Sequence, residues 1–354
     1  MTKGQLFGLF VTEIAQAIAP LGIEKYRAAQ IARWLYQCGV TDFRDMTNLP
    51  ATQRDKLAAA FSVYAPLCKA RQESADGKTT KYLLFLSDGH TIETVLMRQP
   101  YGNSVCVSTQ IGCAMGCLFC ASAIGGFVRN LTEGEMVAQV LYIQRELEQA
   151  GQNVTSVVIM GSGEPFLNYD HVLRFIRLCH DKAVLGLSYR SFTVSTSGIV
   201  PGINRLAEEG LPITLAISLH ATDDNLRTTL MPINKTYGLK DILAAADHYS
   251  AATGRRVTYE YTLIRDVNDR LDHAKQLASL LKGKLAAVNL IPVNPVPEQN
   301  LHRPSQTTID AFASVIKKAG IAVTVRRERG SDIQAACGQL KKQMRNIGSE
   351  ENFD

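Results

Sequence analysis

The strongest constraint on the fold of this 354-residue chain is a regular alternation of strand-like and helical runs from residue 104 onward. The strand-like runs are 104–109, 154–160, 191–196, 213–219, 256–264 and 286–292. The helical runs are 133–149, 169–182, 201–209, 238–252 and 270–282, and a helix at 305–318 and a strand at 321–326 close the series. Strands joined through helices pair in parallel, so the pattern predicts an α/β fold with a parallel sheet, either open or a partial barrel.

Two segments of different character precede this alternation. Apolar residues recur at helical spacing through 1–62, where Trp34 is interpreted as a core residue, whereas 81–86 and 91–97 have strand composition around the turn Ser87-Asp-Gly89. We therefore predict four parts: a helical accessory domain at 1–65, a β-hairpin linker at 66–98, a core at 99–332 and a C-terminal loop and tail at 333–354.

Composition narrows the class of protein. The chain is 46% hydrophobic, yet no apolar run is long enough to cross a bilayer, and its first residues lack a secretion signal. A cytoplasmic location is expected. Three of the eight cysteines lie within eight residues of one another, which in a cytosolic protein indicates a metal site and not a disulfide framework.

The polar motifs fall where the predicted strands end. Parallel α/β folds bind ligands at the carboxyl ends of their strands. The residues at these ends are Cys113, Cys117 and Cys120 after the first strand, Gly163 and Glu164 after the second, Ser195 at the third, Ser218, Leu219 and His220 at the fourth, and Asn294 after the sixth. Each is a weak signal alone, and His220 alone would more often be structural. Their shared position predicts one site.

The most specific motif is the spacing C-x3-C-x2-C at Cys113, Cys117 and Cys120. Three thiolates can hold three irons of a [4Fe–4S] cluster and leave the fourth iron open to a substrate. Structural zinc is the alternative, and it would suit a non-enzymatic RNA-binding protein. Zinc usually takes four closed ligands, and no second pair lies nearby, so the cluster is favoured.

Cys106 and Cys337 form a second group of interest. Cys337 lies in a Gly-flanked polar loop, where a thiol is accessible, whereas Cys38, Cys68 and Cys179 have apolar or helical neighbours. A basic run surrounds this loop: Lys317, Lys318, Arg326, Arg327, Arg329, Lys341, Lys342 and Arg345. Such a run is either a solvated face or a contact for nucleic acid.

These motifs together resemble a known family. The cysteine spacing and Phe119 resemble the radical SAM (S-adenosylmethionine) signature, and the stretches 104–135, 214–234 and 323–340 are similar to the RlmN/Cfr family of radical SAM RNA methyltransferases. The amino-terminal stretch 26–50 resembles the RlmN branch. The resemblance implies a partial (β/α)6 barrel with a small helical accessory domain that contacts RNA. It also implies one cluster held by the three cysteines, and SAM as cofactor.

It also implies roles for residues outside the cluster motif. Cys337 corresponds to a cysteine that carries the methyl group, Cys106 to one that resolves the protein–RNA adduct through a transient disulfide, and Glu93 to a proton acceptor. Without the resemblance, Glu93 would be interpreted as an exposed strand residue. The SAM contacts would be Gly163, Glu164, Ser195, Ser218, Leu219, His220 and Asn294. The chain departs from the family at Ser162, where methionine is common, and in the loop 121–127.

The implied reaction consumes two SAM molecules and methylates carbon 2 of an adenosine in 23S rRNA at the peptidyl-transferase centre. The adenosine beside the anticodon of tRNA is a second candidate substrate. The alternative within the family is Cfr-type methylation of carbon 8, which uses the same five cysteines. The expected electron donor is a flavodoxin or ferredoxin, and the enzyme is expected to be a monomer.

Overall fold

The structure is a computed structural model that describes residues 3–64, 66–294, 299–326 and 330–340. Five members of the basic run, Arg327, Arg329, Lys341, Lys342 and Arg345, and most of the tail at 333–354 lie outside these residues. In the described part of the chain, no helix is long and apolar enough to cross a membrane.

One ten-stranded sheet organises the chain, and its strands lie side by side in chain order. Its strands are β3 (Leu67–Glu73), β4 (Thr79–Phe85), β5 (Thr91–Gln99), β6 (Gly102–Cys106), β9 (Val154–Ile159), β10 (Phe192–Thr196), β11 (Thr214–Ser218), β12 (Val257–Leu263), β13 (Ala286–Pro292) and β14 (Ala322–Val325). Pairing is antiparallel from β3 to β6 and parallel from β6 to β14. The predicted parallel α/β sheet is confirmed, and β3 and β14 are its two edges among the described strands.

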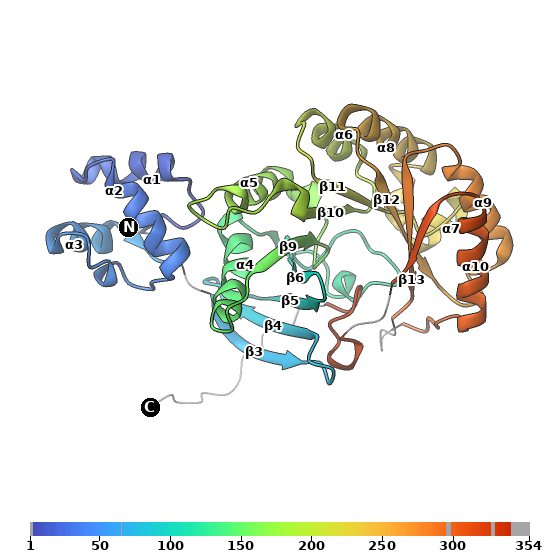
Figure 1. Cartoon of the computed structure of the whole chain (residues 1–354), viewed down its shortest axis with the longest axis horizontal. Helices are drawn as coiled ribbons and strands as arrows, with labels where there is room; N and C mark the ends of the chain where they lie inside the picture. The colour runs from blue at the N-terminus through green and yellow to red at the C-terminus, as the bar shows by residue number, and fades with distance from the viewer. Residues whose placement is uncertain (1–2, 65, 295–298, 327–329, 341–354) are drawn as a thin grey trace.

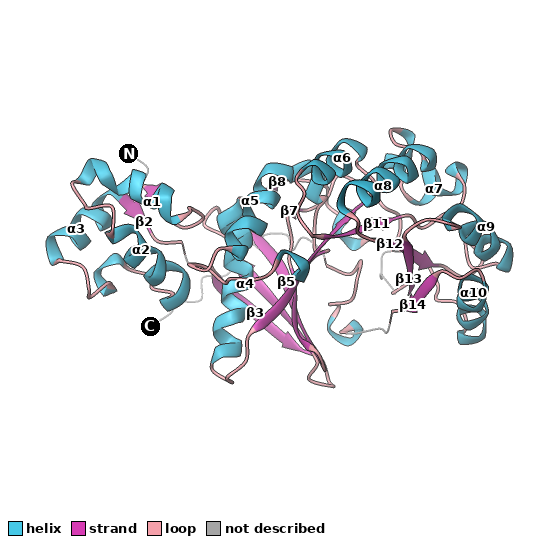
Figure 2. Cartoon of the chain, turned by 45° about the horizontal axis from the view of Figure 1, so that its top comes forward, coloured by secondary structure: helices cyan, strands magenta, loops and turns pink. Residues whose placement is uncertain are grey.

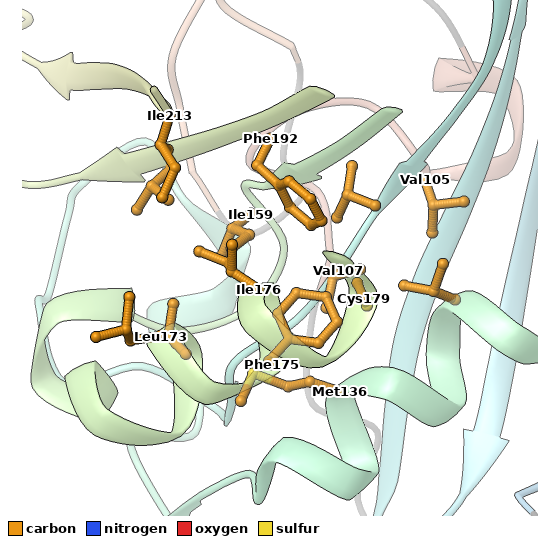
Figure 3. Packing of buried hydrophobic residues seen from close by; sticks show 14 of the residues in the cluster. Val105, Val107, Met136, Ile159, Leu173, Phe175, Ile176, Cys179, Phe192 and Ile213 are labelled. Atoms are coloured by element: carbon orange, nitrogen blue, oxygen red, sulfur yellow. The ribbon is translucent and has the colours of Figure 1, made fainter. Parts of the chain in front are cut away.

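Helices cover the outer side of the parallel strands (Figure 2). They are α4 (Glu133–Glu148), α5 (Tyr169–His180), α6 (Val200–Glu208), α7 (Asp224–Leu230), α8 (Leu239–Thr253), α9 (Leu271–Leu281) and α10 (Gln306–Lys318). Figure 3 shows Met136 of α4 and Phe175 of α5 packed against Val105, Ile159 and Phe192 of the strands. All five side chains are fully buried, so this layer anchors the strands whose ends form the site.

Three helices at the amino terminus form a separate group beside the sheet (Figure 1). They are α1 (Val11–Ile18), α2 (Arg27–Ala32) and α3 (Ala51–Ala60), with a two-strand pair of β1 (Gly4–Gln5) and β2 (Phe61–Ser62). Trp34 is only half-buried, and its indole donates to Asn48 Oδ1 at 2.6 Å. Arg174 of α5 joins this group to the core, since its guanidinium contacts Glu13 at 2.6 Å and Glu133 at 2.9 Å.

Short elements complete the connections. A small sheet pairs β7 (Gln110–Ile111) with β8 (Arg129–Asn130). Single 3₁₀ turns lie at Ala19–Leu21, Phe43–Asp45, Ala121–Ala123, Pro165–Asn168, Tyr189–Ser191, Pro232–Lys235 and Ser331–Ile333, and a π-helical turn at Arg33–Cys38.

The segment 330–340 returns to the sheet and closes over β5 and β6 (Figure 1). Two hydrogen bonds fasten it to the turn after the cysteine motif: Ala121 N donates to the Gly338 carbonyl, and Ser122 Oγ to the Leu340 carbonyl, both at 2.7 Å. Its Ala335 and Leu340 side chains pack on Cys106. The segment 330–340 is thereby brought to the first parallel strand.

Candidate active site

Two adjoining cavities lie at the carboxyl ends of the parallel strands. The smaller, about 160 Å³, is lined by the cysteine motif, and the larger, about 690 Å³, extends along the concave face of the sheet. Both are bordered by Cys120, Glu260, Asn294, Arg326 and Cys337, so they form one continuous site. The structure thus brings together the motifs that the sequence placed at the strand ends.

Cys113, Cys117 and Cys120 all border the smaller cavity. Burial raises the pKa of the Cys113 thiol to about 11 and that of Cys117 further, so thiolates here need compensating positive charge. Among the described residues, no three His, Cys, Asp or Glu side chains converge closely enough to bind a single metal ion. Thiolates are the ligands of iron–sulfur clusters, and all three thiols of the motif border one cavity. The donor set therefore fits an iron–sulfur cluster.

Glycines let the surrounding loops approach closely. Gly163 has φ of +107°, and a Cβ there would lie 2.6 Å from the Cβ of Gln110. The next residue, Glu164, is buried, and its carboxylate accepts from Ser197 N at 2.7 Å, Thr196 Oγ1 at 2.8 Å and Phe166 N at 3.0 Å. Burial raises its pKa, and these donors oppose the shift. Glu164 thus ties the end of β9 to the end of β10 while it borders the cavity.

His220 holds a strained position at the end of β11, with φ of +57°. Its Nδ1 accepts a hydrogen bond from the Thr262 backbone N–H at 2.9 Å, so the neutral ring carries its proton on Nε2. Burial lowers its pKa to about 3, and its ring packs edge-on against Phe119 at 4.6 Å between centroids. Ser195, Ser218 and His220 border the smaller cavity, whereas the Leu219 side chain is fully buried in the core.

Arg227 is a functional candidate that the sequence analysis missed. It is fully buried, and its guanidinium donates to the carbonyls of Ser197 at 2.6 Å, Ser218 at 2.9 Å and Leu219 at 3.1 Å. These bonds fix the loops after β10 and β11, and burial lowers the arginine pKa to about 10. Its charge also favours the Cys117 thiolate. In sequence Arg227 belongs to a short polar helix, α7, where an arginine is usually exposed; its only signal was its place inside 214–234.

Cys106 and Cys337 border the larger cavity together, although they come from opposite ends of the core. Both are free thiols. Burial raises the pKa of Cys106 to about 12; Cys337 acts in the same direction and Arg326 in the opposite one. Asn294 Nδ2 donates to the Cys337 carbonyl at 2.9 Å and thereby positions the loop that carries this thiol.

Glu93 is buried, so its interpretation as an exposed strand residue is wrong. The Lys81 Nζ lies 3.1 Å from its carboxylate, and both side chains are almost fully enclosed. Lys81 also donates to the Gln334 carbonyl at 3.3 Å, which places the ion pair beneath the loop that carries Cys337. Lys81, on the neighbouring strand β4, supplies the positive charge that compensates the buried carboxylate of Glu93. The sequence around Glu93 does not reveal such a partner.

Comparison with known proteins gives the site its context. The model of the radical SAM superfamily matches residues 107–278, and that of the ribosomal RNA large subunit methyltransferase N-terminal domain matches 5–63. A relative from Symbiobacterium thermophilum, described as "Probable dual-specificity RNA methyltransferase RlmN", is 55% identical over 94% of this chain and 90% of its own. One from Geobacillus kaustophilus with the same description is 52% identical over 96% and 93%.

The chain belongs to the RlmN family of radical SAM RNA methyltransferases. A crystal structure of a radical SAM methyltransferase from Sphaerobacter thermophilus shares this fold, with a TM-score of 0.92 and 46% identity over 95% of this chain and 99% of its own. Membership in the RlmN family confirms the sequence resemblance and makes the protein an RNA methyltransferase that uses SAM and an iron–sulfur cluster. The non-enzymatic zinc protein considered from sequence is therefore wrong.

Proposed function

We propose that this RlmN-family enzyme methylates carbon 2 of an adenosine in 23S rRNA at the peptidyl-transferase centre, and the adenosine beside the anticodon in tRNA. The observation that carries the proposal is the shared cavity of Cys106 and Cys337 beside the three-cysteine loop. A radical SAM enzyme needs only the loop to cleave SAM, so a second pair of thiols in the same site points to a covalent methyl carrier. We further propose that the enzyme is a cytoplasmic monomer and that it receives electrons from a flavodoxin or ferredoxin.

The chemistry of the base explains why a carrier is needed. Carbon 2 of adenine is electron-poor and does not attack the methyl group of SAM as a nucleophile. In the proposed reaction the Cys337 thiolate takes the methyl group from a first SAM. The cluster, held by Cys113, Cys117 and Cys120, supplies when bound the electron that cleaves a second SAM to methionine and a 5′-deoxyadenosyl radical.

The protein residues then handle the adduct. Hydrogen abstraction from the S-methyl group of Cys337 by the 5′-deoxyadenosyl radical would give a carbon radical that adds to the base. The adduct radical would then give up one electron, for which the oxidised cluster would be the acceptor, and Glu93 accepts the proton from the reacting ring carbon. The Cys106 thiolate attacks the Cys337 sulfur, and the bond between this sulfur and the transferred carbon breaks as the disulfide forms. The electron pair of the broken bond stays with the transferred carbon, which takes up a proton and becomes the methyl group of the product. The burial of Cys106 under Ala335 and Leu340 supports this role, because it keeps the resolving thiol beside its target and away from water.

Every proposed SAM contact except Leu219, whose side chain is buried in the core, is supported by its place around the smaller cavity. Gly163, Ser195, Ser218 and Asn294 border it together with His220, whose Nε2–H is available as a donor. Glu164 acts by holding the strand ends in place as well as by any direct contact with SAM.

Product analysis tests the proposal. The full-length protein, reconstituted with iron and sulfide without oxygen and then reduced, is incubated with SAM and a 23S rRNA fragment or a tRNA. We expect 2-methyladenosine, with S-adenosylhomocysteine and 5′-deoxyadenosine formed in equal amounts, and no methylated nucleoside from Cys337→Ala. 8-Methyladenosine as sole product would support the Cfr-type reaction instead, and absence of 5′-deoxyadenosine would exclude the radical step.

A further inference from the structure

Glu260 of β12 is a buried carboxylate with one unused oxygen at the junction of the two cavities. The residue is 3% exposed, and its Oε1 accepts a hydrogen bond from Asn289 Nδ2 at 3.1 Å. Among the described residues, its Oε2 has no hydrogen-bond partner. A buried acceptor without a partner costs free energy, so such an atom marks a place where a ligand supplies the missing donor.

The residues next to Glu260 on the neighbouring strands show which cavity its carboxylate borders. Ser218, Glu260, Asn289 and Thr324 stand in register across β11 to β14 and form one polar row on the concave face of the sheet. Glu260, Asn289 and Thr324 border the larger cavity, which also contains Cys106 and Cys337. Burial raises the pKa of Glu260, and the nearby charge of Arg326 opposes this shift. The row thus presents a hydrogen-bond acceptor inside the cavity where the methyl carrier meets its acceptor.

The target base is the group that must enter this cavity, an argument that rests on the proposed function. Adenine carries an amino group on carbon 6, whereas guanine and hypoxanthine carry an acceptor oxygen there. We infer that the Oε2 of Glu260 accepts a hydrogen bond from the 6-amino group of the target adenine and so selects adenine over 6-oxopurines. A 6-oxopurine would place a lone pair against the carboxylate and leave both groups unpaired in a desolvated site, which discriminates strongly.

SAM also carries an adenine with a 6-amino group, so the test must distinguish a contact of Glu260 with the adenine of SAM from a contact with the target adenine of the RNA. The test uses the reconstituted holoenzyme with RNA fragments that carry adenosine, inosine or purine riboside at the target position. All three bases have hydrogen on carbon 2, and purine riboside lacks any substituent at carbon 6. For each RNA the rate of base methylation is measured, and methylation of Cys337 and formation of 5′-deoxyadenosine report on SAM binding separately.

The informative variant is Glu260→Gln, which keeps the shape of the side chain. Its amide oxygen accepts from Asn289, so its amide N–H₂ faces the base and reverses the hydrogen-bonding polarity. We expect the wild type to prefer adenosine over purine riboside by roughly 10- to 100-fold, as for loss of a hydrogen bond to a charged group. Glu260→Gln should lose this preference, gain relative activity on inosine, and methylate Cys337 at the wild-type rate.

The matched control is Glu208→Gln, which changes an exposed glutamate on α6 and should keep every ratio of the wild type. Ratios between substrates are measured on one preparation, so a partly folded variant does not mimic a change of specificity. Unchanged base ratios in Glu260→Gln would overturn the inference, as would a defect confined to Cys337 methylation, which would assign the carboxylate to SAM. A wild-type enzyme that makes no 2-methyladenosine would instead refute the proposed function.

Discussion

The side chain of Asn294, just after β13, donates a 2.9 Å hydrogen bond to the backbone carbonyl of Cys337. This bond fixes the loop that carries the proposed methyl acceptor. We expect Asn294→Ala to slow the first methylation of Cys337 by roughly 10-fold or more, because small displacements of a reacting group cost rate steeply. Mass spectrometry of S-methylcysteine formed in a single turnover measures the effect.

The control for this variant is Asn225→Ala, an exposed asparagine on α7 that lies outside both cavities. Wild-type kinetics of Cys337 methylation in Asn294→Ala would contradict the positioning role.

The buried Arg227 should dominate the stability of the strand ends. Replacing it with methionine leaves the carbonyls of Ser197, Ser218 and Leu219 without their donor. We expect a loss of about 3–5 kcal/mol in the free energy of unfolding, measured by denaturant titration. Arg177→Met removes an exposed ion pair with Glu209 and should cost about 1 kcal/mol or less; similar losses in both variants would show that Arg227 makes no special contribution.

Cys106→Ala should separate the two halves of the reaction. The variant retains Cys337 and the cluster ligands, so methylation of Cys337 proceeds, but no thiol remains to break the bond between protein and RNA. We expect a covalent adduct to accumulate, visible as a protein–RNA species in a denaturing gel. Cys38→Ala removes an exposed thiol and should leave no adduct. Multiple turnovers by Cys106→Ala would refute its proposed role.

His220 should make stability depend on pH below neutrality. Its pKa in the folded protein is lowered to about 3 by burial, below the ordinary value of 6.5, so below 6.5 the unfolded chain binds a proton that the folded chain does not. The contribution of His220 to the free energy of unfolding is therefore fully present above pH 6.5. It is lost as the pH falls below this value, by up to about 1.4 kcal/mol per pH unit.

Urea titrations of the wild type and His220→Asn between pH 7.5 and 4.5 measure this difference. Asparagine tolerates the positive φ and does not titrate, so its curve should be flatter. The exposed His248→Asn should follow the wild type. Parallel curves for wild type and His220→Asn would show that the ring does not carry the effect.

Sequence predicted the elements whose pattern is long and periodic. The helices at 133–149 and 238–252 appear as Glu133–Glu148 and Leu239–Thr253. The buried residues of the second share one face, as its sequence pattern predicts, whereas the first is buried around most of its circumference. It missed β3, whose seven residues are mostly exposed and lack apolar alternation. It also missed α7, a seven-residue polar helix held by Arg227.

The residues of the site also fall into those that sequence predicts and those that it does not. The positions of the cysteines and of the strand-end residues followed from the order of the elements along the chain. The burial of Glu93 and Glu260 did not, because each is paired with a residue of a neighbouring strand, Glu93 with Lys81 and Glu260 with Asn289. Charged residues inside strands resemble solvent-facing residues until the sheet pairs them.

The chain-order arrangement of the sheet has a consequence for assembly. Each strand of the ten-stranded sheet after β3 pairs with the strand that precedes it in that sheet, so the core can grow unit by unit from neighbouring elements. The docking of 330–340 on β5 and β6 is different, since it joins segments far apart in sequence and so costs more loop-closure entropy. We therefore expect Cys337 to reach Cys106 only after the strands of the sheet have paired, so that the two thiols of the proposed reaction meet late in folding.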